Sequence, residues 1–164
     1  MAFDLALRPF RPDDLPILHR IREAAFAPVF ASFRALVGAE IASIALADAE
    51  AEQGRHLEEI AAGASGHRLL VVEAGGAVAG FVSFRVDPAR RGGEIGLNAV
   101  HPDFAGRGVG TWMYGEALAR MKALGAEVAE VGTGGDSSHA AARRAYEKAG
   151  FGPAIPALHL YRRL

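Results

Sequence analysis

The chain opens with a short strand pattern that is followed by helical spacing. Apolar residues in the range 5–10 predict a first strand, and Pro9 confines it to an edge or an end because proline donates no ladder hydrogen bond. Residues 11–14 contain a proline and two aspartates, a composition typical of a helix start. The apolar residues that follow recur every three or four positions, which predicts a helix, and Pro28 predicts its end.

The pattern stays helical between Pro28 and the next cluster of glycines. Residues 30–46 are apolar at mixed spacing, and residues 47–62 are rich in alanine and glutamate. We therefore expect one or two further helices in this region, ending near Gly63–Gly66.

The rest of the chain alternates strand-like runs with two further helical patterns. The predicted strands occupy residues 68–74, 77–86, 94–100, 127–131 and 158–162. The predicted helices occupy residues 109–125 and 139–149, and Gly150 is a suitable helix end because glycine adopts left-handed backbone angles at little cost. This order of elements predicts one mixed α/β domain over residues 1–164.

Composition narrows the classes of function. The 18 Lys and Arg residues nearly balance the 19 Asp and Glu residues, which argues against a nucleic-acid or anionic membrane partner. The absence of cysteine excludes a disulfide framework, a Cys nucleophile and a thiolate metal site, and the histidines show no metal-ligand spacing, so we expect no metal. The N-terminus lacks the features of a signal peptide and no apolar run approaches about twenty residues, so we expect a cytoplasmic protein.

The segment Phe104–Thr111 carries the strongest chemical signal in the chain. Gly106, Gly108 and Gly110 fall at alternate positions between a predicted strand and a predicted helix. Glycines let a pyrophosphate approach the main chain, and N–H groups at a helix N-terminus can bind its oxygens. Arg107 adds a positive charge. The pattern favours an anion site over the alternative, a helix cap in which the glycines merely turn the chain.

Two common phosphate-binding templates do not fit this segment. A Walker loop requires Lys after its last glycine, and no Lys follows any of these glycines. The dinucleotide fingerprint also fails, because its third glycine position falls on Thr111 or on Met113, depending on the starting glycine. Nucleoside triphosphates and NAD are therefore disfavoured.

Two blocks of sequence resemble the GNAT superfamily of N-acetyltransferases. The family signature is Gln or Arg, two further residues, Gly, one residue, and Gly or Ala, and it corresponds to 105–110, with Ala105 at the first position. The second block, His139–Phe151, resembles the family helix that ends in Leu-Tyr-Glu-Lys-x-Gly-Phe. The resemblance extends in element order from Leu7 to Tyr161. It implies a single-domain α/β (α+β) fold with a mixed, mostly antiparallel sheet of about six to seven strands and about four helices.

The resemblance also implies an activity, the transfer of an acetyl group from acetyl-CoA to a primary amine by direct attack in a ternary complex. It implies main-chain donors at Ala99 and Val100, where the family strand often bulges, and a place for His139 beside the pantetheine arm. The remaining residues that it assigns to the coenzyme are Ala105, Gly106, Arg107, Gly108, Val109, Gly110 and Thr111. Because Ala105 replaces a basic or amide side chain, we expect the backbone and Arg107 to hold the phosphates.

Two side chains match family positions with catalytic roles. Tyr146 matches a tyrosine near the coenzyme sulfur and would protonate the leaving thiolate, although it can also be read as a core aromatic. Glu94 stands where the family often places an acid that deprotonates the amine through water, although a surface glutamate is an equally good interpretation. Glu73 and His101 are less favoured bases.

Further polar and aromatic residues allow two readings each. Asp136 and His139 could form a catalytic pair, but their spacing across a helix start favours a capping role for Asp136 or Ser137. Phe26 and Phe30 share a helical face if no break intervenes, and core packing is the plainer reading. The resemblance places them, together with Arg34, on a wall of the acceptor site.

The acceptor itself is left open. A small-molecule or peptide amine fits the resemblance, and a homodimer stays possible. Two other classes of function remain as alternatives: a non-catalytic acyl-CoA-binding module of the same fold, and an enzyme that binds nucleotide phosphates with the glycine segment.

Overall fold

The computed structural model describes residues 4–164. Met1 to Phe3, which belong to the predicted single domain and to the stretch that argues against a signal peptide, lie outside the described residues. The helices and strands, in chain order, are β1 (Leu5–Pro9), α1 (Leu15–Val37), α2 (Ala39–Ala45), α3 (Ala49–Ala61), β2 (Arg68–Ala74), β3 (Ala77–Asp87), β4 (Gly92–Val100), α4 (Val109–Ala123), β5 (Val128–Val131) and α5 (Ala140–Lys148). Short 3-10 turns cover Pro12–Asp14, Pro102–Phe104 and Ser137–His139.

The strands form one mixed sheet whose spatial order follows the sequence. Strands β1 to β4 pair antiparallel with their neighbours, and β5 pairs parallel to β4 at the edge. The α/β class and the mostly antiparallel sheet are as expected. Within residues 4–164 the sheet has five strands rather than six to seven.

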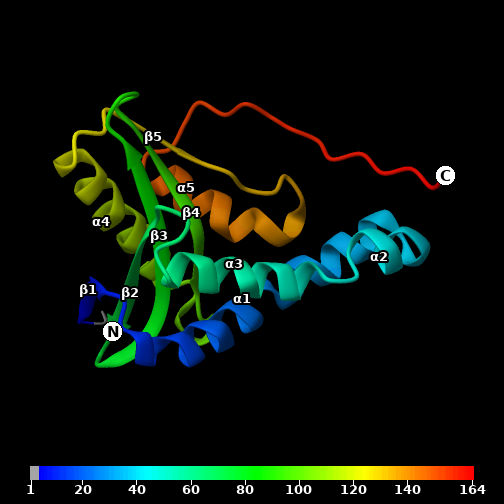
Figure 1. Cartoon of the computed structure of the whole chain (residues 1–164), viewed down its shortest axis with the longest axis horizontal. Helices are drawn as coiled ribbons and strands as arrows, with labels where there is room; N and C mark the ends of the chain where they lie inside the picture. The colour runs from blue at the N-terminus through cyan, green and yellow to red at the C-terminus, as the bar shows by residue number, and fades with distance from the viewer. Residues whose placement is uncertain (1–3) are drawn as a thin grey trace.

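Helices cover both faces of the sheet (Figure 1). Helices α1 and α3 pack on one face around a buried cluster that includes Leu18, Leu57 and Phe81. Helices α4 and α5 pack on the other face around a second cluster that includes Phe84 and Met113. No helix in residues 4–164 has the length and apolar character needed to cross a membrane.

The predicted helix end at Pro28 is wrong. Helix α1 continues through Pro28 to Val37. A proline inside a helix removes one backbone hydrogen bond and costs about 3 kcal/mol. Apolar residues are buried on both sides of it, Ile21 before and Phe30 after, and their packing offsets that cost.

The predicted closing strand at 158–162 is also wrong. Residues 151–164 have no regular structure and run from the end of α5 toward α2 (Figure 1). The alternation of Leu158 and Leu160 suits a strand, but a strand also needs a neighbour for its backbone hydrogen bonds. Here the two leucine side chains are 87% and 88% exposed, and Arg163 pairs with Glu40 of α2 at 2.6 Å.

Candidate functional site

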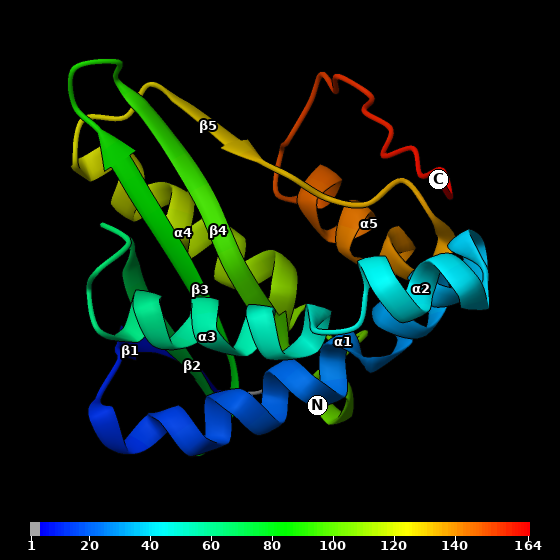
Figure 2. The same ribbon diagram turned by 45° about the vertical axis from the view of Figure 1, so that its right-hand side comes forward.

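Strands β4 and β5 separate halfway along β4. They pair only from Gly92 to Ile95, where β5 ends, and the segment after β5 runs away from β4 (Figure 2). The β3 register places Phe84 opposite Ile95 but Val82 opposite Asn98, so β4 carries one extra residue, a bulge, between Ile95 and Asn98. The bulge lies at residues 96–97, ahead of Ala99 and Val100, where the resemblance led us to expect it; those two residues pair regularly with β3. The edge of residues 96–100 that faces away from β3 therefore has no strand partner within residues 4–164.

A cavity of ≈ 660 Å³ occupies the space beside this unpaired edge. Its walls come from residues 94–100 of β4, the glycine segment, the start of α4, one side of α5 and part of α1. Ala99 and Val100 both line it, and Ala99 also packs into the core on the α1 side. The cavity thus brings together the two sequence blocks that resemble the family, residues 105–110 and 139–151.

The glycine segment ends at the N-terminus of α4. Gly106 and Gly108 have φ of 71° and 83°, left-handed angles that favour glycine, and Gly108 caps the helix. A Cβ at either position would meet no protein atom within 4 Å, so the space beside this backbone is open. Trp112 is the first residue whose N–H bonds back, to Gly108 O at 3.0 Å. The N–H groups of residues 109–111 are therefore available to an anion.

Only some residues of this segment line the cavity. Ala105, Gly110 and Thr111 line the cavity together with the two left-handed glycines. The side chain of Val109 is buried in the core, so that residue can offer a ligand only its backbone. Arg107 lies on the exposed side of the loop, outside the lining of the cavity. The expectation that the backbone and Arg107 together hold the phosphates stays a prediction.

Tyr146 lies on the cavity wall in a small polar network. Its Oη accepts a hydrogen bond from Asn98 Nδ2 at 3.1 Å, and Tyr114 Oη donates to Asn98 Oδ1 at 2.9 Å. The two tyrosine rings lie 4.5 Å apart. Burial raises the pKa of Tyr114, and its neighbour Tyr146 raises it further, so Tyr114 stays protonated as a donor. Tyr146 Oη is 3.4 Å from Asn98 Oδ1, which is a long contact for its own proton.

Sequence reasoning missed Asn98 and Tyr114 as parts of this site. One signal was present: Asn98 is a polar residue inside the apolar run from Ile95 to Val100. Asn98 is half-buried, and its amide finds hydrogen-bond partners in Gly96 O and the two tyrosines.

Glu94 lines the cavity but is already paired. Its Oε2 accepts from Arg85 Nε of the neighbouring strand at 2.6 Å. The carboxylate of Glu94 is therefore within the site and is held by an ion pair with Arg85.

The α1 residues that were assigned to the acceptor wall separate into two groups. Because α1 is not broken at Pro28, Phe26 and Phe30 share a face, with their ring centroids 6.3 Å apart. Phe26 lines the cavity, and Phe30 is buried behind it. Arg34 lies elsewhere: it donates to Glu50 Oε1 at 2.6 Å and is outside the cavity.

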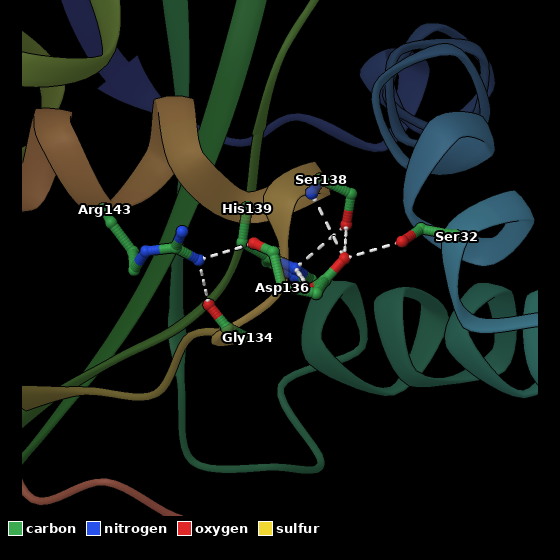
Figure 3. Close-up of polar contacts among 6 residues, drawn as sticks. All are labelled: Ser32, Gly134, Asp136, Ser138, His139 and Arg143. Atoms are coloured by element: carbon green, nitrogen blue, oxygen red, sulfur yellow. Dashed lines mark hydrogen bonds and ion pairs between the residues drawn. The ribbon is translucent and has the colours of Figure 1, made fainter. Parts of the chain in front are cut away.

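Asp136 is the centre of a hydrogen-bonded cluster at the start of α5 (Figure 3). Its Oδ2 accepts from Ser32 Oγ at 2.8 Å and from Ser138 N at 3.1 Å, which confirms the capping role. Its Oδ1 lies 2.8 Å from His139 Nδ1. Burial alone would raise the pKa of Asp136, but the hydrogen bonds from Ser138, Ser32 and His139 outweigh it and hold that pKa far below its usual range. Asp136 is therefore ionised, and its partner His139 lines the cavity.

No group of three or more His, Asp or Glu side chains in residues 4–164 is arranged to hold a metal ion.

The chain is similar in sequence and structure to known acetyltransferases. The sequence model described as the acetyltransferase (GNAT) family matches residues 37–151, more than half of the chain. A GNAT family acetyltransferase from Brucella melitensis, solved with acetyl-CoA, has 23% identity and a TM-score of 0.60, over 94% of this chain and 92% of that one. No curated protein matched in the corresponding sequence comparison.

Two further solved structures share the architecture. A GCN5-related N-acetyltransferase from Ralstonia eutropha has 22% identity and a TM-score of 0.63, over 96% of this chain and 98% of that one. An aminoglycoside acetyltransferase from an uncultured soil metagenomic sample, in complex with sisomicin, has 17% identity and a TM-score of 0.62, over 98% and 96%. At these identities the structural likeness establishes the fold, and fold alone does not assign an acceptor.

Proposed function

Because the chain belongs to the acetyltransferase (GNAT) family, we propose that it transfers an acetyl group from acetyl-CoA to a primary amine. The amine attacks the thioester directly while both substrates are bound. The observation that carries this proposal is the single cavity that connects the N-terminus of α4, the unpaired edge of β4 and Tyr146. An acyl-CoA needs these three features in that order: an anion site, a slot for an extended arm and a proton donor near the thioester.

The coenzyme is held mainly by main-chain groups. Its pyrophosphate binds the N–H groups of residues 109–111, where the positive end of the α4 dipole adds to their attraction. Gly106 and Gly108 have left-handed backbone angles and no side chain that could block its path. The pantetheine arm follows the edge of β4 that β5 leaves unpaired.

The acetyl group lies near the bulge in β4. An N–H group of the unpaired edge stabilises the oxyanion that forms when the amine attacks. When the C–S bond breaks, Tyr146 Oη donates its proton to the sulfur. Asn98 supports this role because it donates to Tyr146 Oη and so leaves the phenolic proton free to point at the sulfur.

The acceptor enters from the side of α1. Phe26 and Val29 give that end of the cavity an apolar wall, and Glu94 and His56 add polar groups. This lining suits an amine carried on a partly apolar small molecule or peptide. It does not distinguish between those two classes.

The test is a turnover screen of acetyl-CoA against representative amines: amino acids, polyamines, aminoglycosides and peptides with free N-termini or lysines. Release of free CoA that depends on one class of amine, together with an acetylated product of the expected mass, supports the proposal. Binding of acetyl-CoA without turnover on any class supports instead a non-catalytic acyl-CoA-binding module. A thermal shift in CoA but none in ATP or NAD dismisses a nucleotide-dependent enzyme, because a ligand stabilises only the state it binds.

A further inference from the structure

The loop that precedes α5 is built closely around the ring of His139. Arg143 Nη1 donates to Gly134 O at 2.5 Å and to Asp136 O at 2.7 Å, which fixes the loop from the side of α5 (Figure 3). A Cβ at Gly134 would lie 2.7 Å from His139 Cε1 and 2.8 Å from Asp136 Oδ1, so only glycine allows the loop to pack this close. At neighbouring Gly135, a Cβ would meet nothing within 4 Å.

The opposite side of the ring is held by α1. Phe33 stacks on His139 with ring centroids 5.7 Å apart and an interplanar angle of 23°. Ser32, on the same helix, donates to Asp136 and so ties the carboxylate to α1. Three separate parts of the chain therefore fix one imidazole, which is more than a helix cap requires.

This arrangement selects one tautomer of His139. Because Asp136 is ionised, its Oδ1 can only accept, so the proton of the neutral ring resides on Nδ1. Nε2 then carries a lone pair, and it makes no hydrogen bond to any residue in the range 4–164. An imidazole with Nδ1 bound to a carboxylate and Nε2 free is oriented to accept a proton.

The ring also lies on the same side of α5 as the proposed proton donor. His139 directly precedes α5, and Tyr146 lies in the last turn of that helix, about 10 Å further along its axis. Both line the same cavity. An acceptor amine between them can reach Nε2 directly or through one water.

We propose that His139 accepts the proton of the acceptor amine in the acetyl transfer and that Asp136 is its positioning residue; this inference rests on the proposed function. The ammonium of the acceptor gives one proton to Nε2, and Asp136 stabilises the resulting imidazolium. The neutral amine forms a C–N bond to the acetyl carbon as the C–S bond breaks. The sulfur takes the phenolic proton of Tyr146, and the second proton of the nitrogen restores the phenol. The proton on His139 leaves to solvent.

The other charged and titratable groups near His139 come from α5 and from the remaining walls of the cavity. Helix α5 contributes Arg143, held by the loop carbonyls, and Arg144 and Lys148 on the cavity wall. Helix α1 contributes the uncharged Ser32 and Phe33 at this point. Tyr146 lies further along α5, and His56 and Glu94 also line the cavity, with Glu94 paired to Arg85.

The test compares pH profiles of His139→Gln and Asp136→Asn with that of the wild type, using the amine with the highest turnover. For the wild type, log kcat/KM should rise with pH with a slope near one and then level. In His139→Gln the ascending limb should disappear. Its kcat should fall about 10²-fold, with the KM for acetyl-CoA little changed. Asp136→Asn should lower kcat, because a neutral amide no longer fixes the proton of the ring on Nδ1. His159→Gln, in the exposed tail, is the control histidine.

A glycine pair provides a matched control for position. Gly134→Ala should displace the ring and reproduce the loss of kcat, whereas Gly135→Ala should leave the profile unchanged. Histidine ¹⁵N spectra of the wild type provide a readout besides activity: Nδ1 should carry the proton and Nε2 should not. The opposite tautomer overturns the inference.

The outcomes separate the two proposals. A wild type without turnover on any amine contradicts the proposed function, and the inference fails with it. An active His139→Gln variant that keeps the ascending limb contradicts this inference alone. A variant with unchanged kcat and a raised KM for acetyl-CoA also contradicts it, because His139 would then hold the coenzyme rather than take the proton.

Discussion

At the scale of single residues, the hydroxyl of Tyr146 is positioned by a bond that it accepts. Asn98 donates to that oxygen at 3.1 Å and is itself fixed by Tyr114 and by Gly96 O. This arrangement leaves the phenolic proton for another acceptor.

Tyr146→Phe keeps the ring and removes only the hydroxyl. If Tyr146 protonates the leaving thiolate, kcat should fall about 10²-fold, with the KM for acetyl-CoA little changed. Steady-state assays across the pH range measure both constants. Tyr161→Phe, in the exposed tail, is the control for the loss of a tyrosine hydroxyl. An unchanged kcat for Tyr146→Phe at every pH would show that the residue is only a packed aromatic.

Asp14 gives a second residue-scale prediction, on stability. Hydrogen bonds from Arg8 outweigh the effect of burial and hold the pKa of Asp14 below its usual range. The folded state is thus stabilised at pH values above about 4, and this contribution is lost as the pH falls through the lowered pKa. Asp14→Asn should cost about 2 kcal/mol at pH 7 and progressively less in acid.

Urea unfolding of Asp14→Asn and wild type at pH 7 and at about pH 3 measures this difference. The adjacent Asp13→Asn, at an exposed position, is the control and should stay within about 0.5 kcal/mol of the wild type. A penalty for Asp14→Asn that is the same at both pH values would contradict the ion-pair explanation.

At the scale of elements, the contact between β3 and β4 depends on Gly80. A Cβ there would lie 2.6 Å from Ala99 O and 3.2 Å from Val100 Cα, and both atoms belong to backbone. Gly80→Ala should therefore force the strands apart where the acetyl group is proposed to bind. We expect a loss of about 2 kcal/mol in the free energy of unfolding and weaker binding of acetyl-CoA.

Gly115→Ala is the matched control for this element-scale prediction. Gly115 lies inside α4, where a Cβ would meet nothing within 4 Å. Alanine is the better helix former, so this variant should be stabilised by about 1 kcal/mol. Chemical denaturation and calorimetric titration with acetyl-CoA measure both variants. Equal stability of the two would contradict the predicted close contact at Gly80.

Local sequence patterns predicted most of the helices and strands, but they failed where contacts between residues far apart in the sequence determine the structure. The strands at 68–74 and 77–86 and the helix from Val109 follow directly from apolar runs, turn glycines and a helix stop. The break at Pro28 was wrong because packing on both sides of a proline outweighs its local cost.

The candidate site likewise contains residues that the sequence predicted and residues that it did not. The glycine segment and Tyr146 were predictable from spacing and from the family resemblance, and both line the cavity. The network of Asn98 and Tyr114 was not, because it depends on a bulge that shifts the register of β4 by one residue. The family resemblance assigned Arg34 to the acceptor wall, but its side chain pairs with Glu50 and lies outside the cavity.

At the scale of the whole molecule, the tail after α5 is the least integrated part of the described chain. Phe151 still packs edge-on against Tyr146, with ring centroids 5.8 Å apart, but beyond it Ile155, Leu158 and Leu160 are almost fully exposed. The pair of Arg163 with Glu40 is exposed as well, and such pairs contribute about 0–1 kcal/mol. The folded domain therefore gains little from the tail.

Deletion of residues 153–164 should therefore change the free energy of unfolding by less than about 1 kcal/mol, whereas Phe151→Ala should cost about 3 kcal/mol. Urea unfolding of both variants measures the two values. If the tail instead forms the strand that its alternation predicts, several leucine-sized side chains become buried at about 2 kcal/mol each. The deletion would then cost several kcal/mol. Analytical ultracentrifugation of the full chain and of the deletion variant shows where that strand pairs. If both are monomers, the strand pairs within its own chain. If the full chain is a dimer and the deletion variant is a monomer, the strand pairs with a second copy.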